Sequence, residues 1–122
     1  MKIRSMLGAW CASLALTVSG LFAAPNILYI SSANDANYQS FVQTRFPEAV
    51  WVQKAPGTGA DQIGGDLDVT ADFTGVNGGT GLTRRAYIES FDLVIIGVPN
   101  TSTQYQVGAD WAAISKPILV HS

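Results

Sequence analysis

Three groups of polar residues in this sequence could do chemistry, and each group follows a run of apolar residues. They are Ser31, Ser32, Asn34 and Asp35; Asn100, Thr101 and Ser102; and His121 with Ser122. Hydroxyls, amides, one carboxylate and one imidazole suit hydrogen bonds to a polar or sugar-like ligand better than they suit metal chelation. We therefore expect a site for a small polar ligand, without a metal or a cofactor. The alternative is that these are ordinary turn residues, because turns favour Ser, Asn and Asp.

His121 and Ser122 are the pair that could carry catalysis. His121 is the only histidine, and histidine is the side chain that titrates nearest to neutral pH. A structural role is the alternative, because Asp35 is the only carboxylate that the expected topology brings near it. Ser122 could act as a nucleophile only if a turn and a helix followed it to hold its hydroxyl and supply an oxyanion hole. We assign the pair a catalytic role only if the chain continues, and we do not expect the printed chain to be an enzyme.

Four strands are expected to position these polar groups. Three runs are continuously apolar and open onto small polar residues, as strands buried on both faces of a parallel sheet do. They are Asn26–Ser32, Asp92–Pro99 and Lys116–Ser122, and a shorter strand is expected at Ala49–Gln53. Between the strands, apolar residues recur at the spacing of helices. One helix is expected over Tyr38–Phe46, and a second runs from its N-cap Thr83 to Phe91. A third carries Val107, Trp111 and Ile114 on its apolar face.

Strands that alternate with helices predict an α/β fold. The expected form is a three-layer, open parallel sheet of flavodoxin-like type, with strand order 2-1-3-4 and helices on both faces. The last strand lies at an edge of this sheet, so we expect the fold to be incomplete at its C-terminus and the edge to be covered by a missing C-terminal segment. Ligands bind such sheets at the carboxyl ends of the strands where the order reverses. The three polar groups converge there.

Residues 55–82 form a segment of a different kind, rich in Gly and Asp. The composition predicts a long loop rather than a helix. Two other interpretations remain open. The backbone N–H groups of Gly78–Gly81 could bind an anion, although the Lys-Ser/Thr ending of a phosphate-binding loop is missing. Four aspartates could bind calcium, although their spacing differs from that of an EF-hand loop; they are Asp61, Asp66, Asp68 and Asp72.

The first 24 residues have the pattern of a secretory signal peptide. Lys2 and Arg4 give a basic start, and an apolar stretch and small residues follow. Residues 25–122 would then form one domain of a secreted, periplasmic or cell-envelope protein. An uncleaved anchor is the alternative, because Ser5–Ala24 is nearly long enough to span a bilayer. Cys11 is the only cysteine and lies in this segment, so the domain has no thiol or disulfide chemistry.

The charge of the domain argues against two classes of partner. Lys2 and Arg4 are two of the seven basic residues, so residues 25–122 carry five basic and nine acidic residues, a net charge of −4. No basic stripe is present to neutralise phosphates, so we expect neither nucleic acid nor an anionic membrane as the partner. Arg84 and Arg85 form the only basic pair, and we interpret them as the solvated start of a helix.

Two segments carry a resemblance to a known family. Phe91–Gly97 and Lys116–Ser122 resemble the class I glutamine amidotransferase-like superfamily, in which a strand of the second form carries the nucleophilic cysteine. The resemblance places Ser122 at the position of that cysteine, and the His-Ser ending is similar to the trehalose-utilisation-type branch. The downstream His and Glu of the family's triad have no counterpart in the printed chain, so the resemblance does not imply amidotransferase activity. The whole chain also resembles secreted bacterial proteins of unassigned function.

Three hypotheses of function follow from these patterns. The first is an exported, non-catalytic α/β module, the N-terminal part of a longer protein, that binds a polar ligand or packs against the missing C-terminal segment. The second is a fragment of a hydrolase acting on carbohydrate or ester substrates, with Ser122 as the nucleophile and His121 as the orienting residue. The third is a structural cell-surface domain whose loop 55–82 contacts a partner.

Overall fold

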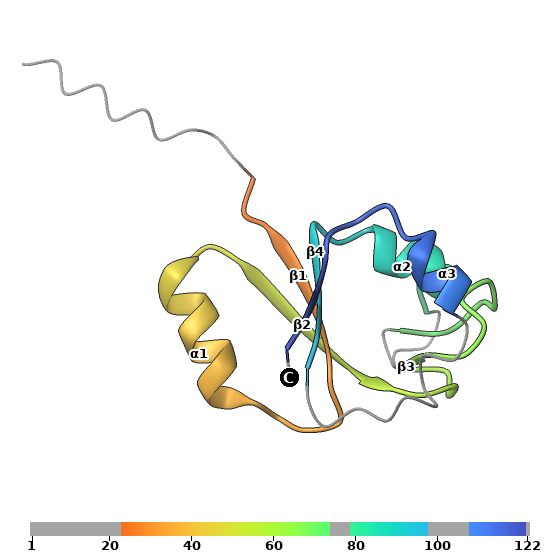
Figure 1. Ribbon diagram of the computed structural model, residues 1–122, viewed down its shortest axis with the longest axis horizontal. Helices are drawn as coiled ribbons and strands as arrows, with labels where there is room; N and C mark the ends of the chain where they lie inside the picture. The colour runs from red at the N-terminus through yellow and green to blue at the C-terminus, as the bar shows by residue number, and fades with distance from the viewer. Residues whose placement is uncertain (1–22, 74–78, 98–107, 122) are drawn as a thin grey trace, which may run out of the picture.

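A parallel five-stranded sheet forms the centre of the protein (Figure 1). The computed structural model describes residues 23–73, 79–97 and 108–121. The elements follow in the order β1 (Asn26–Ile30), α1 (Ala36–Arg45), β2 (Val50–Pro56), β3 (Gln62–Ile63), α2 (Arg84–Glu89), β4 (Leu93–Ile96), α3 (Gly108–Ala112) and β5 (Ile118–Val120). No helix within these ranges is long and apolar enough to cross a membrane. The α/β class expected from the sequence is confirmed.

The strand order is β3-β2-β1-β4-β5, and each neighbouring pair is parallel. The expected order 2-1-3-4 is wrong because it lacks β3. The four expected strands correspond to β1, β2, β4 and β5, which keep their relative positions. β3 escapes a pattern search because it consists of two residues, Gln62 and Ile63, inside a Gly-rich segment. Two residues are too few to show the periodicity of a strand.

Helices cover both faces of the sheet, so the elements lie in three layers. On one face Ile27 and Tyr29 of β1 pack with Val42 of α1. On the other face Leu28 and Ile30 belong to a core cluster that includes residues of α2 and α3. Figure 1 shows α1 on one side of the strands and α2 with α3 on the other. Alternate residues of a strand point to opposite faces, so the four residues of β1 after Asn26 are all buried and largely apolar, because both faces of the strand are covered.

Two helices begin at residues that cap them with a side-chain oxygen. Thr83 Oγ1 accepts a hydrogen bond from the backbone N–H of Ala86 at 3.2 Å, which confirms Thr83 as the N-cap of α2. Asp35 Oδ1 accepts a hydrogen bond from the backbone N–H of Tyr38 at 2.9 Å and caps α1. Each cap satisfies one of the donors that the first turn of a helix leaves unpaired. Asp35, expected as a ligand-binding residue, therefore also has a structural task.

Residues 55–82 contribute to the core and are not merely a loop. The segment contains β3 and an antiparallel bridge between Thr70 and Thr83. Its buried apolar residues belong to the same cluster as α2; they are Ile63, Leu67, Ala71 and Phe73. The composition predicts a long loop because Gly and Asp dominate it, whereas these four spaced apolar side chains anchor the described part of it to the sheet.

Arg84 holds this segment in place from inside the protein. Its side chain is 4% exposed, and its guanidinium donates hydrogen bonds to four backbone carbonyls: Thr58 O at 2.7 Å, Asp66 O at 3.1 Å, Gln62 O at 3.2 Å and Gly59 O at 3.3 Å. The interpretation of Arg84 as part of a solvated helix start is wrong. A planar group with five N–H donors can serve several carbonyls at once, which a pattern of charges along the sequence does not reveal.

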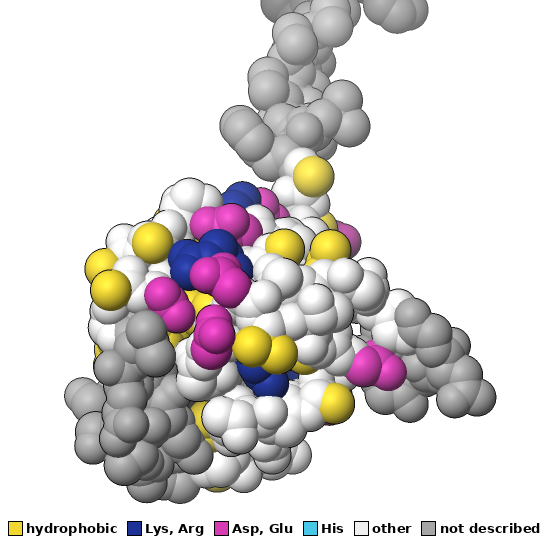
Figure 2. Space-filling view, turned by 90° about the vertical axis from the view of Figure 1, so that its right-hand side faces the viewer, with side chains coloured by type: hydrophobic (Ala, Val, Ile, Leu, Met, Phe, Trp, Pro, Cys, Tyr) yellow, Lys and Arg dark blue, Asp and Glu magenta, His cyan; other side chains and the backbone are white. Residues whose placement is uncertain are grey.

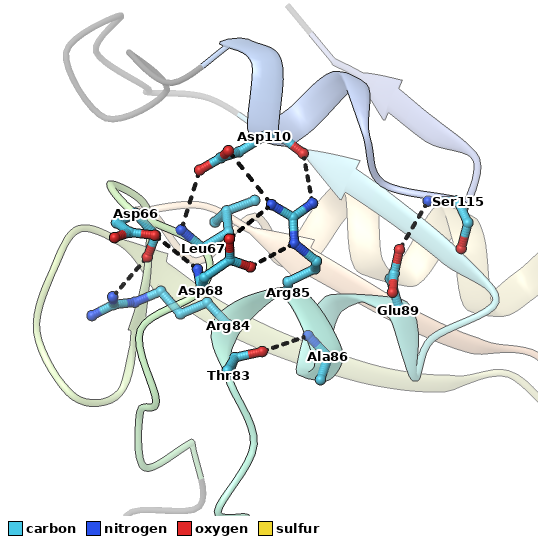
Figure 3. A network of polar contacts seen from close by, with 10 residues as sticks. All are labelled: Asp66, Leu67, Asp68, Thr83, Arg84, Arg85, Ala86, Glu89, Asp110 and Ser115. Atoms are coloured by element: carbon cyan, nitrogen blue, oxygen red, sulfur yellow. Dashed lines mark hydrogen bonds and ion pairs between the residues drawn. The ribbon is translucent and has the colours of Figure 1, made fainter.

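Arg85 lies at the surface and joins three parts of the chain. Its Nε donates to Asp68 Oδ1 at 2.7 Å, and its Nη2 lies 3.5 Å from Asp110 Oδ1 of α3. The hydrogen bond between Arg85 and Asp68 lowers the pKa of Asp68 and raises that of Arg85. Figure 2 shows basic side chains flanked by acidic ones on the side of the molecule that carries α2 and α3, and Figure 3 shows the network of Arg85 in detail.

Candidate functional site

The loop after β1 carries the first predicted group of polar residues. Ser31 is buried, and its Oγ accepts a hydrogen bond from the backbone N–H of Ala33 at 3.2 Å. Asp35 is half-buried, whereas Ser32 and Asn34 are exposed. Ser31 and Asp35 thus remain candidates for a site inside the fold, and Ser32 and Asn34 lie on its outside.

Gln53 of β2 fixes the path of this loop. Its Nε2 donates hydrogen bonds to Ala33 O at 2.9 Å and to Ser31 O at 3.4 Å. The backbone N–H of Ser31 in turn donates to Lys54 O at 3.0 Å, which continues the pairing of β1 with β2. The sequence predicts a strand at Gln53 but no part for this residue in the site. Its role depends on a contact between residues about 20 positions apart, which only the register of the two strands reveals.

The second predicted group, Asn100, Thr101 and Ser102, lies outside the described residues, and so does Ser122. The last described residue before the second group is Gly97, whose backbone N–H donates to Ile30 O at 2.9 Å. The ends of β1 and β4 are therefore adjacent at the point where the order of the sheet reverses.

His121 reaches the same region from β5. Its backbone N–H donates to Ile96 O at 2.8 Å, so it continues the pairing of β5 with β4. Its imidazole stacks on the ring of Tyr38, with 4.3 Å between ring centroids and 4° between the planes. Tyr38 belongs to the first turn of α1, which Asp35 caps. This stack therefore brings the predicted residues Asp35 and His121 to the same end of the sheet.

Tyr29 packs against Tyr38 of this stack. Its part in the site was not predictable from the sequence. Its side chain is fully buried. Its ring lies 5.9 Å from that of Tyr38 and 4.8 Å from that of Trp51, centroid to centroid. Its Oη passes so close to Gly97 that a Cβ atom at that position would overlap it. An aromatic residue in a buried strand looks like ordinary core, and the only sequence signal is that it shares a strand face with residues that pack on α1.

Three buried polar atoms in this region have no hydrogen-bond partner among the described residues. They are Tyr29 Oη, Trp51 Nε1 and His121 Nδ1. More than nine in ten buried polar groups in proteins are paired with protein or with ordered water. Leaving such an atom unpaired costs about 1–3 kcal/mol. All three belong to one aromatic cluster, which is why this cluster is the candidate site.

Burial dominates the electrostatics of Tyr29. It raises the pKa of the phenol, and the Asp35 carboxylate and Tyr38 raise it further. The nearby Ser31 hydroxyl opposes this rise, but it does not meet the geometry of a hydrogen bond to Tyr29 Oη. The phenol therefore stays protonated at neutral pH and is available as a hydrogen-bond donor.

The Gly/Asp-rich segment does not support either of its alternative roles. A Cβ atom at Gly79 would lie 2.6 Å from Asp72 Oδ1. A carboxylate therefore lies close to the described part of the proposed anion-binding turn, Gly79–Gly81, and would repel an anion there. Asp61 forms an ion pair with Lys54, and Asp68 forms one with Arg85. Within the described ranges, no three His, Cys, Asp or Glu residues gather in a way that could hold a metal ion.

The arrangement can bind by hydrogen bonds and by contact with aromatic rings. Tyr29 Oη and Trp51 Nε1 can donate, and His121 Nδ1 can donate or accept according to its tautomer. A search for matching family models, curated proteins and solved structures finds no match to this chain.

Proposed function

We propose that this protein is an exported, non-catalytic α/β module that binds a small polar ligand beside the aromatic cluster where the first turn of α1 meets the end of β5. The observation that carries the proposal is a group of three buried polar atoms that have no hydrogen-bond partner in the described part of the chain: Tyr29 Oη, Trp51 Nε1 and His121 Nδ1. A flavodoxin-like sheet binds its ligands where the strand order reverses. In this sheet that place lies between β1 and β4, next to Tyr29 and Gly97.

The chemistry of the site favours a neutral, hydroxyl-rich ligand. Hydroxyl groups can pair with each of the three atoms as donor or acceptor. The half-buried rings of Tyr38 and Trp51 offer apolar surface for the carbon skeleton of a sugar-like molecule. A free anion suits this site less well than a neutral ligand. The Asp35 carboxylate is close enough to affect the pKa of Tyr29, and it would repel an anion bound there.

Binding without catalysis is supported by the surroundings of His121. A general base of the serine-hydrolase type uses one imidazole nitrogen to hold an orienting carboxylate. His121 Nδ1 has no hydrogen-bond partner in the described part of the chain, and the one candidate carboxylate, Asp35, is engaged as the cap of α1. Export rests on the residue pattern of positions 1–24.

The test is an NMR titration that follows the His121 imidazole, whose signals are unambiguous because the chain has a single histidine. The probes are glucose, trehalose, glycerol and inorganic phosphate. We expect a saturable shift of the His121 signals with the sugars and none with phosphate. The proposal fails if no hydroxyl-rich probe produces a saturable shift.

A pair of variants separates this site from the rest of the protein. Tyr29→Phe removes only the unpartnered hydroxyl, so we expect sugar binding to weaken about three- to tenfold, the value of one hydrogen bond. Stability should be unchanged or slightly higher, because a buried group without a partner is removed. The control is Tyr87→Phe, which changes a buried tyrosine in the cluster on the other face of the sheet and should leave binding unchanged. Equal effects of both variants on binding would contradict the assignment of Tyr29.

A further inference from the structure

Among the described strands, β5 lies at an edge of the sheet, and its outer side has no neighbour. Pro117 O accepts a hydrogen bond from Val94 N at 3.0 Å, and His121 N donates to Ile96 O at 2.8 Å, so these two residues turn their main chain toward β4. Main-chain groups of successive residues in a strand point in opposite directions. Ile118 and Val120 therefore direct their N–H and C=O groups away from β4, where no described strand pairs with them.

The side chains of this edge are apolar and largely uncovered. Leu119 is 49% exposed and Val120 is 66% exposed. Leu119 pairs with Ile95, which faces α1, and Val120 pairs with Ile96, which faces α2 and α3. Natural edge strands usually carry charged residues, prolines or bulges that prevent further pairing. The three residues of β5 include no charge and no proline, so the protection of this edge is limited to the shortness of the strand and to Lys116 and Pro117 before it.

We propose that β5 pairs with β5 of a second copy of this chain and joins two five-stranded sheets into one continuous sheet. Two identical strands related by a two-fold axis must run antiparallel. The register that uses the outward groups of both copies places Ile118 opposite Val120 of the second copy. Each such pair exchanges two N–H···O=C bonds, which gives four across the axis. A shift by one residue would place outward groups against inward ones, and a shift by two residues would leave only one such pair within β5, so this register makes the most hydrogen bonds.

This register is self-complementary in its side chains as well. Leu119 lies on the axis and meets Leu119 of the second copy as a non-hydrogen-bonded pair, the closer of the two kinds of antiparallel pair. The contact covers an exposed leucine on the α1 face, and the Val120–Ile118 pairs cover apolar surface on the other face. The nearest side chain with a fixed charge is Lys116, three positions from the axis, so no like charges meet at the centre. A second copy is therefore the occupant that this edge fits.

The first test is the association state of the purified protein, measured by sedimentation velocity over a hundredfold range of concentration. Three residues per copy make a small interface, so we expect a weak dimer in rapid exchange with the monomer rather than a permanent one. The sedimentation coefficient should rise with concentration toward that of a dimer and no further, because the pairing consumes the edge of both copies. A monomer at every concentration overturns the proposal and leaves β5 to a different partner strand.

Charge substitutions at the axis test the register itself. Leu119→Lys and Leu119→Asp each place like charges opposite one another, so each variant alone should dimerise at least about tenfold more weakly than the wild type. An equimolar mixture should regain dimer, because opposite charges then meet across the axis. The matched control is Val69→Lys, at a site 45% exposed and far from β5 in the sequence, which should dimerise like the wild type. Failure of the mixture to recover, or an equal loss in the control, overturns the proposed register.

A third variant covers the case in which a charge at position 119 disturbs the fold. Val120→Pro deletes an outward N–H and leaves the bond from His121 N to Ile96 O in place, and proline is tolerated in edge strands. We expect the circular dichroism spectrum to stay that of the wild type while the dimer is lost. A variant that keeps its fold and still dimerises contradicts the pairing.

Discussion

Replacing Gly97 by alanine should force Tyr29 out of its position and thereby destabilise the protein. A Cβ atom at residue 97 would lie well under 3.0 Å from Oη, Cζ and Cε2 of Tyr29, whereas carbon atoms in good contact are about 3.5–4.0 Å apart. The ring must therefore shift by roughly 1 Å within a fully buried site. Gly97 is not among the glycines with positive φ, so the cost is steric. Overpacking of this kind costs about 1–3 kcal/mol, and we expect about 3 kcal/mol because the phenol oxygen and two ring atoms of Tyr29 all overlap.

The assay is urea denaturation of the wild type and the variants, followed by the fluorescence of Trp51 and the other tryptophans. In thermal denaturation of the same variants, a loss of about 3 kcal/mol corresponds to a fall in Tm of roughly 12–24 °C for a domain of this size. Gly108→Ala is the control, because nothing lies within 4 Å of a Cβ atom at that position and alanine suits the first turn of a helix. The double variant Gly97→Ala/Tyr29→Ala should lose about 2 kcal/mol less stability than the sum of the losses in the two single variants, because the overlap disappears with the ring. Equal stabilities of the Gly97→Ala and Gly108→Ala variants would refute the close packing of Tyr29 under Gly97.

Three further substitutions probe the frame that holds the site. Arg84→Met removes the buried donor to four carbonyls, so it should cost at least about 3 kcal/mol in urea denaturation, and a loss no greater than that of Arg85→Met would contradict this role. Asp35→Ala removes the cap of α1 and should cost about 1 kcal/mol, with a change in the Tyr38 ring signals in NMR spectra; unchanged stability and spectra would speak against the cap. The lowered pKa of Asp68 means that its ion pair adds stability above the ordinary aspartate pKa of 3.8, and this contribution is lost as the pH falls through the lowered folded-state value. On acidification the wild type should therefore lose its advantage over Asp68→Asn, and a constant difference between the two would contradict the shift.

The general fold could be predicted because each strongly patterned element agrees with its surroundings. The four residues of β1 after Asn26 form a largely apolar run because both faces of the strand are buried, and α2 begins at a threonine that caps it. β3 and Arg84 could not be predicted in the same way. The first is too short to show a period, and the position of the second depends on carbonyls 18–26 residues away along the chain.

The candidate site could be predicted in outline but not in its most buried residues. Because all strands are parallel, topology alone brings the carboxyl ends of β1 and β5 to the same end of the sheet. Asp35 and His121 therefore both contact Tyr38: Asp35 accepts from its backbone N–H, and His121 stacks on its ring. Tyr29 and Trp51 could not be recognised, because an aromatic residue in a strand is normally part of the core. What distinguishes them is that Tyr29 Oη and Trp51 Nε1 have no hydrogen-bond partner among the described residues. That property depends on side-chain positions within the packed fold, which the sequence does not show.

The most direct test of the ligand site is a high-resolution crystal structure of the protein grown with trehalose. We predict electron density for the sugar within hydrogen-bond distance of both Tyr29 Oη and His121 Nδ1, and a structure without the sugar at this place would contradict the account. A structure in which both atoms are hydrogen-bonded to protein groups instead would show that the cluster is an ordinary part of the core, and it would contradict the proposed binding site.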